Sequence, residues 1–503
     1  MRQTCILLIG LLLSAGRNGA RADCPPPIPG QSNQLQNQFI IGIASYADPQ
    51  AVFAMIDQQW PGTTIVSGIE GRAIYLLQPP PSVVDCDIVE NLLITWVNPF
   101  PTIVDPSRPL WFAELNFEEE LPEGHTGTIF IKTPPAQVHT EYQEQYALLK
   151  MQVPTAQARS TGRGTAVAVV DTGVDAQHDV LQGHVLPGFN FVTMSTDTND
   201  TPQGLDTNGN GTFDELTGHG TYMAGLIALI APETMILPVV VLDSDGRGDQ
   251  FRLAQGIYYA IDHGVEVINL SLGSTDSSDL IEAAVTEARD RGILVVAAAG
   301  NRNTDSIEES PANDEDVISV AATDADDLKA PFSSYGHSIV LCAPGDSSFL
   351  SGGTDPDPNR SVFSSVPGGD GSDIASWEGS SLSTAFVSGA AALVRAQHPE
   401  WAPNAATNAL LAQVLESTAE PIDALNPQYV GDLGRGRVAI GAAVAAGPVM
   451  PLPGDLNNDG HVDLTDLSTL LVSYGSVHSS ADLNADGIVD LEDLARLLEQ
   501  FGI

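Results

Sequence analysis

Residues 166–175 read Ala-Val-Ala-Val-Val-Asp-Thr-Gly-Val-Asp, an apolar run that ends in a carboxylate on a glycine turn. Residues 235–242, 265–270 and 293–299 have the same nearly continuous apolar character. Strands that are buried on both faces carry such runs, and they belong to parallel sheets covered by helices. Helical patterns alternate with these runs. We therefore predict an α/β domain over residues 142–446.

Three polar turns follow apolar runs or open helical patterns, which is where α/β proteins place their sites. They are Asp171-Thr172-Gly173, Gly218-His219-Gly220 and Gly379-Ser380-Ser381. A hydroxyl is a weak nucleophile until an imidazole removes its proton, and the imidazole needs a carboxylate to fix its tautomer. Asp171, His219 and Ser381 together meet this requirement.

These three residues follow one another along the chain in the order Asp, His, Ser. With this order and these motifs, residues 142–446 resemble the subtilisin-like serine peptidases, or subtilases. The resemblance implies a subtilisin-like fold and hydrolysis of polypeptides, with Ser381 as nucleophile, His219 as general base and then acid, and Asp171 as the orienting group. It also implies that Asn301 and the Ser381 N–H stabilise the oxyanion. The segments that match the family's cleft contribute Ser271, Leu272, Gly273 and Gly300.

Several positions depart from the family pattern without removing a reacting group: Ser380 replaces the usual Thr, and Tyr222, Leu382, Ser383, Ala385 and Phe386 replace other frequent residues. A catalytically inactive subtilase fold that acts only as a binding or scaffold protein is the rival hypothesis. An α/β-hydrolase esterase is disfavoured, because its order is Ser, then Asp, then His.

The primary specificity pocket has two open interpretations. Matching Ser310-Pro311-Ala312 to the family's pocket wall places Glu309, with Glu308, near the pocket floor, where acidic groups favour Arg or Lys before the scissile bond. The alternative is a solvated acidic loop.

The first residues indicate export. A charged start, a short apolar core and the sequence Ala20-Arg21-Ala22 predict a signal peptide over residues 1–22 and a secreted protein. No later stretch is long and apolar enough to predict a membrane span. Cys24 and Cys86 are candidates for a disulfide, whereas Cys342, in an apolar run, is predicted to be a buried strand thiol.

Residues 38–99 predict a small α+β domain of the ferredoxin-like type. The expected strands are 39–44, 63–66, 73–77 and 94–97, and the expected helices are 51–59 and 83–92. This element order resembles subtilase propeptides, which assist folding and inhibit the enzyme; an ordinary accessory domain is the alternative. Residues 100–141 are expected to be a loose linker, and residues 447–453 a stiff one.

Residues 454–503 contain a duplication with a period of 482 − 455 = 27 residues. Each copy has the oxygen-ligand spacing of a calcium loop followed by a helix. The expected ligands are Asp455, Asn457, Asp459, the carbonyl of His461, Asp463 and Asp466 in one loop, and Asp482, Asn484, Asp486, the carbonyl of Ile488, Asp490 and Asp493 in the other. The pair resembles a type I dockerin, which implies bound Ca²⁺ and a cohesin-like partner on a scaffold or cell surface. A third acidic loop, residues 206–214, is either a calcium site or a polar loop.

The charge balance excludes one class of partner. The chain has 20 Lys+Arg against 64 Asp+Glu, a net charge of 20 − 64 = −44. Such a polyanion is repelled by a phosphate backbone, so nucleic-acid binding is not expected.

Overall fold

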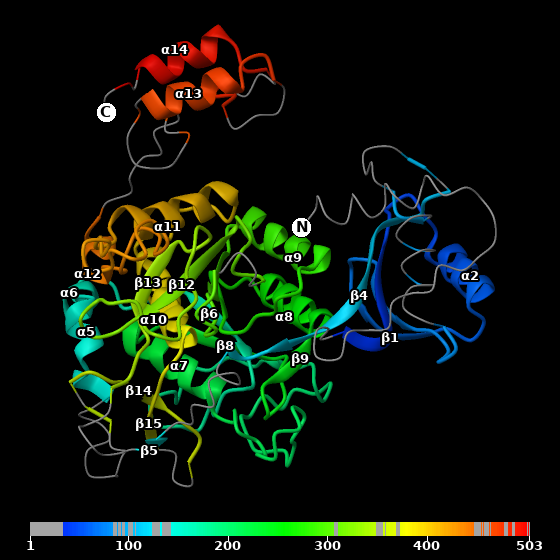
Figure 1. Cartoon of the computed structure of the whole chain (residues 1–503), viewed down its shortest axis with the longest axis horizontal. Helices are drawn as coiled ribbons and strands as arrows, with labels where there is room; N and C mark the ends of the chain where they lie inside the picture. The colour runs from blue at the N-terminus through cyan, green and yellow to red at the C-terminus, as the bar shows by residue number, and fades with distance from the viewer. Residues whose placement is uncertain are drawn as a thin grey trace.

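The computed structural model describes residues 34–83, 107–122, 142–305, 310–348, 359–368, 373–446, 464–476, 481–484 and 488–499, with isolated positions between them. Its three parts follow one another along the chain (Figure 1). We call residues 34–122 the N-terminal domain, 142–446 the central domain and 454–503 the C-terminal module. The expected signal peptide, Cys24 and Cys86 lie outside the described residues.

A seven-stranded sheet forms the middle of the central domain, in the order β13-β12-β11-β10-β6-β8-β7. All its neighbouring strands are parallel. Each predicted apolar run became a strand, and Cys342 is a buried free thiol on β13. The strands are β6 Ala166–Asp171, β7 Phe189–Asn190, β8 Met235–Val240, β10 Val267–Leu270, β11 Leu294–Ala298, β12 Val317–Thr323 and β13 Leu341–Pro344.

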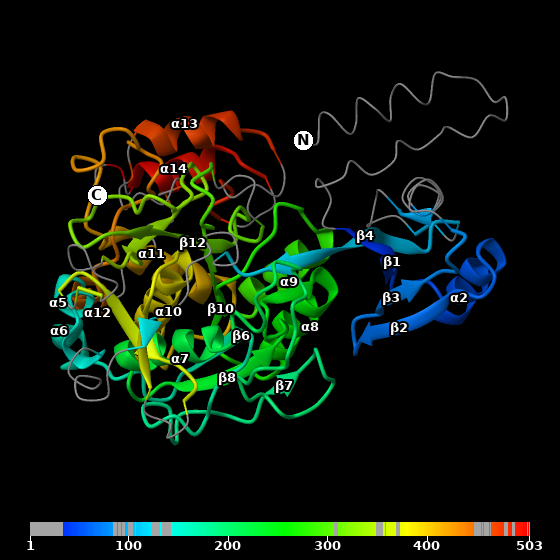
Figure 2. The same cartoon turned by 60° about the horizontal axis from the view of Figure 1, so that its bottom comes forward.

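Helices cover this sheet in two groups. Helix α10 packs against β10–β13 and against α7, whereas α8 and α9 pack on each other beside the N-terminal domain (Figure 2). The helices are α5 Tyr146–Lys150, α6 Val153–Gln157, α7 His219–Ile230, α8 Gln250–Asp262, α9 Asp279–Asp290, α10 Ser380–Gln397, α11 Ala405–Ser417 and α12 Ile440–Ala445. A small second sheet contains β5 Ile131–Lys132, β14 Val362–Ser365 and β15 Ile374–Trp377.

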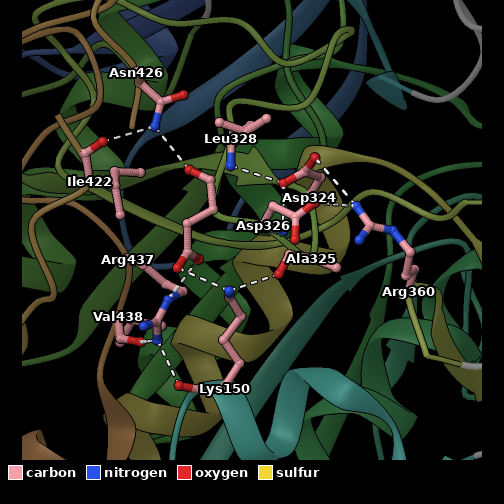
Figure 3. Close-up of polar contacts among 11 residues, drawn as sticks. Lys150, Asp324, Ala325, Asp326, Leu328, Arg360, Ile422, Asn426, Arg437 and Val438 are labelled. Carbon is pink, nitrogen blue, oxygen red and sulfur yellow. Dashed lines mark hydrogen bonds and ion pairs between the residues drawn. The ribbon is translucent and has the colours of Figure 1, made fainter. Parts of the chain in front are cut away.

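A buried ion network ties the two ends of the central domain together (Figure 3). The Asp327 carboxylate lies 3.0 Å from Nζ of Lys150 and 2.8 Å from Nε of Arg437. Asn426 donates its amide to the Asp327 carbonyl oxygen at 2.9 Å. Breaking one partner of such a pair leaves the others charged and buried, which is costly.

The N-terminal domain has the antiparallel strand order β2-β3-β1-β4, with helix α2. Its bounds are β1 Gln34–Ile43, α2 Pro49–Gln59, β2 Thr64–Ile69, β3 Ile74–Gln78 and β4 Leu110–Glu120. Strand β4, which pairs with β1 and at its end with β9 Arg247–Asp249, lies within the expected linker 100–141, so that expectation was wrong there. Its acidic end resembles a loop in sequence but is held by groups of the central domain. Of the expected closing strand 94–97, the described part makes only a bridge at Val97.

In the C-terminal module, helices α13 Leu464–Val472 and α14 Leu491–Glu499 lie side by side (Figure 1). The buried residues repeat with the sequence period: Val462 corresponds to Val489, and Leu470 to Leu497. Throughout the described part of the chain, no helix is both long and apolar enough to cross a bilayer.

Candidate functional site

The centre of the site is a contact between Asp171, at the end of β6, and His219, at the start of α7. Nδ1 of His219 lies 2.9 Å from Oδ1 and 3.0 Å from Oδ2 of Asp171, and both side chains are fully buried. The Thr172 N–H donates to Asp171 Oδ1 at 2.7 Å, which holds the carboxylate. A carboxylate in this place favours the tautomer with hydrogen on Nδ1, so the other ring nitrogen can accept a proton.

The two glycines around His219 permit this approach. Gly218 caps α7 in a left-handed conformation, with φ of 98°. A Cβ on Gly220 would lie 2.2 Å from the Gly173 carbonyl oxygen and 3.1 Å from Asp171 Cβ. Helix α7 therefore comes close to β6 because position 220 carries no side chain.

A second carboxylate, Asp200, supports the turn and was not identified from sequence. It accepts hydrogen bonds from the Gly218 N–H at 2.9 Å and from the N–H and hydroxyl of Thr221 at 3.1 and 2.8 Å. Burial raises the pKa of Asp200 to about 6, with a smaller contribution from the charge of Asp171. Asp200 thus holds the backbone on both sides of His219.

Ser381 lies in the first turn of α10 and is tied to the predicted cleft residue Ser271. The Ser381 hydroxyl donates to the Ser271 carbonyl oxygen at 3.2 Å, and the Ser271 hydroxyl donates to the Ser381 carbonyl oxygen at 3.2 Å. Four residues before Ser381, the Trp377 ring packs edge-on against the His219 imidazole, with 5.4 Å between centroids. The end of β15, which leads into the serine turn, therefore lies beside the imidazole.

The departure at Tyr222 fits this arrangement. Its buried hydroxyl accepts from the Trp377 N–H at 3.2 Å and donates to the Val362 carbonyl oxygen at 2.8 Å. The Trp377 backbone is thereby fixed beside α7.

Asn301, the predicted oxyanion donor, is oriented by Ser380. Its Oδ1 accepts from the Ser380 N–H and from the Ser380 hydroxyl, both at 2.9 Å. The same hydroxyl accepts from the Gly300 N–H at 3.1 Å. Because the carbonyl end is held by Ser380, the Nδ2 donors of Asn301 point away from it. Serine in place of threonine therefore keeps the hydroxyl that orients the amide.

The end of β4 lies along the predicted cleft residue Gly273. Glu118–Glu120 pair in antiparallel register with Arg247–Asp249, which form strand β9. On the other side, the Gly273 N–H donates to the Glu120 carbonyl oxygen at 3.2 Å, and the Glu120 N–H donates to the Gly273 carbonyl oxygen at 3.4 Å. Pro122 follows and lines one cavity with Ala298, Gly300 and Asn301. Leu272, the remaining cleft residue predicted from sequence, is fully buried.

Some predicted residues fall outside the described part of the chain. They are Glu308 and Glu309 of the specificity hypothesis, and Asp455, Asn457, Asp459, His461, Asp463 and Asp486 of the predicted calcium loops. Within the described residues, no group of three or more His, Cys, Asp or Glu is placed to hold a metal ion. In the third acidic loop, Asp214 accepts the N–H groups of residues 203–205, which favours the polar-loop interpretation.

The described ends of the two loops that are predicted to bind calcium have matching contacts. Asp466 accepts the Leu456 N–H at 2.8 Å, and Asp493 accepts the Leu483 N–H at 2.7 Å. Both aspartates are buried. The twelfth position of each loop thus reaches back to the second, so the duplication in sequence is also a duplication in structure.

Comparison with known proteins identifies the family to which the central domain is similar. A model of the subtilase family of peptidases matches residues 162–449. The chain is 36% identical to subtilisin BL from Lederbergia lenta over 291 residues, covering 56% of this chain and 93% of that protein. It is also 36% identical to thermitase from Thermoactinomyces vulgaris over 288 residues, covering 55% of this chain and 89% of thermitase.

Two solved structures extend the comparison. Fervidolysin from Fervidobacterium pennivorans, a keratinolytic enzyme related to subtilisin, matches with a TM-score of 0.62 at 20% identity, over 82% of this chain and 62% of fervidolysin. A protease from Pseudoalteromonas arctica matches with a TM-score of 0.50 at 30% identity, over 59% of this chain and 93% of that protease. The chain therefore belongs to the subtilase family, whose members are serine peptidases that hydrolyse peptide bonds.

Proposed function

We propose that the chain is a secreted serine endopeptidase that uses Asp171, His219 and Ser381 as its catalytic triad. The observation that carries the proposal is the buried contact of His219 Nδ1 with both carboxylate oxygens of Asp171, at 2.9 and 3.0 Å. A buried carboxylate stabilises the imidazolium that forms when the histidine accepts a proton.

In the proposed reaction, Ser381 Oγ attacks the scissile carbonyl carbon while Nε2 of His219 takes its proton. Asn301 Nδ2 and the Ser381 N–H donate to the oxyanion, and His219 then protonates the leaving amine. A water molecule then attacks the acyl-enzyme through the same proton-transfer steps and releases Ser381. Removal of one oxyanion donor typically costs on the order of 10²–10³ in kcat.

A fluorophosphonate probe tests this proposal, because it reacts only with an activated serine. We expect the matured protein to be labelled on Ser381, and Ser381→Ala to be unlabelled. Ser417→Ala, which removes an exposed hydroxyl at the end of α11, is the matched control and keeps the labelling. An unlabelled parent protein would instead support the alternative, an inactive subtilase fold that acts as a binding or scaffold protein.

We further propose that the N-terminal domain is a ferredoxin-like propeptide that inhibits the enzyme. Its Arg72 contacts Asp262 of α8 at 2.9 Å and Glu287 of α9 at 2.9 Å. Its Glu114 accepts the Ser278 hydroxyl at 2.7 Å and the Asp279 N–H at 2.8 Å, at the start of α9. Together with the β4 strand along Gly273, these contacts support a domain that blocks the cleft.

N-terminal sequencing of the secreted protein tests this role and the export signal together. We expect loss of residues 1–22 and a new N-terminus between residues 100 and 150. Ser381→Ala should retain the domain, since no activity is left to remove it. Secretion of active parent protein that still carries residues 38–99 covalently would contradict the propeptide role.

For the C-terminal module, we propose a dockerin that binds Ca²⁺ and a cohesin-like partner. The matching contacts of Asp466 and Asp493 support it, and the oxygen-rich loops suit a hard cation. Exposed apolar residues also repeat with the 27-residue period: Leu464 with Leu491, Leu471 with Leu498, and Tyr474 with Phe501. Such paired surfaces are suited to a protein partner.

Calorimetric titration of the full chain with CaCl₂ tests the module. We expect binding at two sites, and loss of one site in each of the variants Asp466→Ala and Asp493→Ala. Pull-down with an immobilised cohesin in the presence of Ca²⁺, but not of EDTA, is the expected partner result. Absence of any calcium binding would refute the assignment.

A further inference from the structure

The cleft carries two arginines that contact acidic side chains of the chain's own strand β4. Arg247 Nη1 lies 2.6 Å from Glu118 Oε2, and Arg247 Nη2 lies 3.6 Å from Glu120 Oε2. Arg302 Nη2 lies 2.8 Å from Glu120 Oε1. The chain has only 20 Lys+Arg against 64 Asp+Glu, so two arginines that pair with one short acidic segment are unusual in it.

The segment lies where an extended substrate would lie. It is hydrogen-bonded on one side to β9 and on the other to Gly273. The Leu121 N–H donates to the Gly246 carbonyl oxygen at 3.1 Å and continues this pairing. Backbone pairing of this kind accepts many sequences, so side-chain pockets must supply the selectivity.

Pro122 fixes the register of the segment. It lines the same cavity as Asn301, the proposed oxyanion donor. A substrate residue in the place of Pro122 would therefore carry the carbonyl that is attacked. Counting back from that bond, Glu120 occupies the third position and Glu118 the fifth.

Successive side chains of the strand point to opposite faces, and the charged groups around the two faces differ. Residues two apart share a face, so Glu118 and Glu120 both reach the arginines. Glu119 points to the other face, where burial, with smaller contributions from the charges of Asp249 and Asp276, raises its pKa well above the usual range. The cleft thus presents cations to the third and fifth positions and an acidic environment to the fourth.

We propose that Arg302 and Arg247 determine specificity, so that the enzyme prefers substrates with Glu or Asp at the third and fifth residues before the scissile bond. The proposal rests on the peptidase function proposed above. The same ion pairs hold the N-terminal domain in the cleft, so the propeptide has the acidic pattern that the substrates share. On this register, the matured protein begins at residue 123.

The test uses the matured enzyme from the full chain and three internally quenched peptides. They contain the sequence of residues 118–122 and differ only at the place of Glu120, which is Glu, Gln or Lys. Ion pairs that are partly exposed are screened and modest in strength, so we expect kcat/KM for Glu to exceed that for Gln by roughly fivefold. The preference should shrink in 1 M NaCl, where the screening length falls to about 3 Å.

Variants of the enzyme make the test specific. Arg302→Gln should remove the preference for Glu over Gln, and Arg302→Glu should reverse it in favour of the Lys peptide. Arg163→Gln, an exposed arginine paired with Glu233, is the control and should behave as the parent. A merely structural role of Arg302 predicts loss of rate on all three peptides without reversal.

The outcomes separate this inference from the function on which it rests. Equal kcat/KM for the three peptides in the parent enzyme, or an unchanged preference in both Arg302 variants, overturns the inference alone. An enzyme that hydrolyses none of the peptides and is not labelled by fluorophosphonate overturns the proposed function, and this inference with it. If the Arg302 variants do not fold, the parent's preference and its salt dependence still decide.

Discussion

Protonation of Glu114 should control how tightly the N-terminal domain docks on the peptidase. Burial raises the pKa of Glu114 from 4.5 to about 7, more than its hydrogen bonds to the start of α9 lower it. Once the domain leaves, the carboxyl is again in water and its pKa returns towards 4.5. At a pH between 4.5 and about 7, the Glu114 carboxyl therefore keeps its proton in the docked state and loses it in the released state.

The sign and size of the effect follow from this difference. Docking is fully favoured below pH 4.5 and weakens as the pH rises towards 7, because the released carboxyl ionises first. A shift of one pKa unit is a tenfold change in the equilibrium, so Glu114 alone accounts for at most about 300-fold. Glu119, whose pKa burial also raises, acts in the same direction.

The assay measures the dissociation constant of the cleaved, non-covalent complex by dilution and size-exclusion chromatography between pH 4.5 and 8.5. We expect the dissociation constant of the parent complex to increase as the pH rises. Glu114→Gln and Glu119→Gln should each remove part of this dependence, because glutamine does not titrate. A parent profile that is flat over this range, or unchanged in both variants, would refute the reasoning.

Three further predictions concern catalysis, stability and calcium. Ser380→Ala should lower kcat roughly tenfold or more with little change in KM, because Asn301 loses its orienting hydroxyl, and Ser380→Thr should retain kcat; steady-state kinetics distinguish them. Asp327→Ala should destabilise the protein by about 3–5 kcal/mol in urea unfolding, because Arg437 stays charged and buried and the half-buried Lys150 loses the same partner. EDTA should unfold the C-terminal module and affect the fold of the central domain less. Hydrogen exchange would show this as a larger loss of amide protection in the module, and equal loss of protection in both parts contradicts it.

The parallel sheet could be predicted from sequence because its strands are buried on both faces, which requires continuous apolar runs such as residues 166–170. The turns that bear Asp171, His219 and Ser381 could be predicted because each combines a reactive group with glycine. The structure brings the carboxylate and the imidazole into contact at the places these turns indicate.

Strand β4 could not be predicted, because its acidic end is stabilised by Arg247 and Arg302, which are remote in sequence. Asp200 also has no local signal. It lies in a polar loop, and its role depends on N–H groups of the turn that begins at Gly218. For Ser380, the sequence showed the departure from threonine, but only the folded chain shows the hydroxyl on Asn301.

The rate of fluorophosphonate labelling in Asp171→Asn shows whether Asp171 and His219 activate Ser381 as one unit. Asparagine keeps the shape but favours the wrong imidazole tautomer, so we predict labelling slower by about 10³–10⁴-fold in a protein with unchanged thermal stability. Labelling of Ser381 at the parent rate in a folded Asp171→Asn protein would show that the Asp171 carboxylate takes no part in activating the serine.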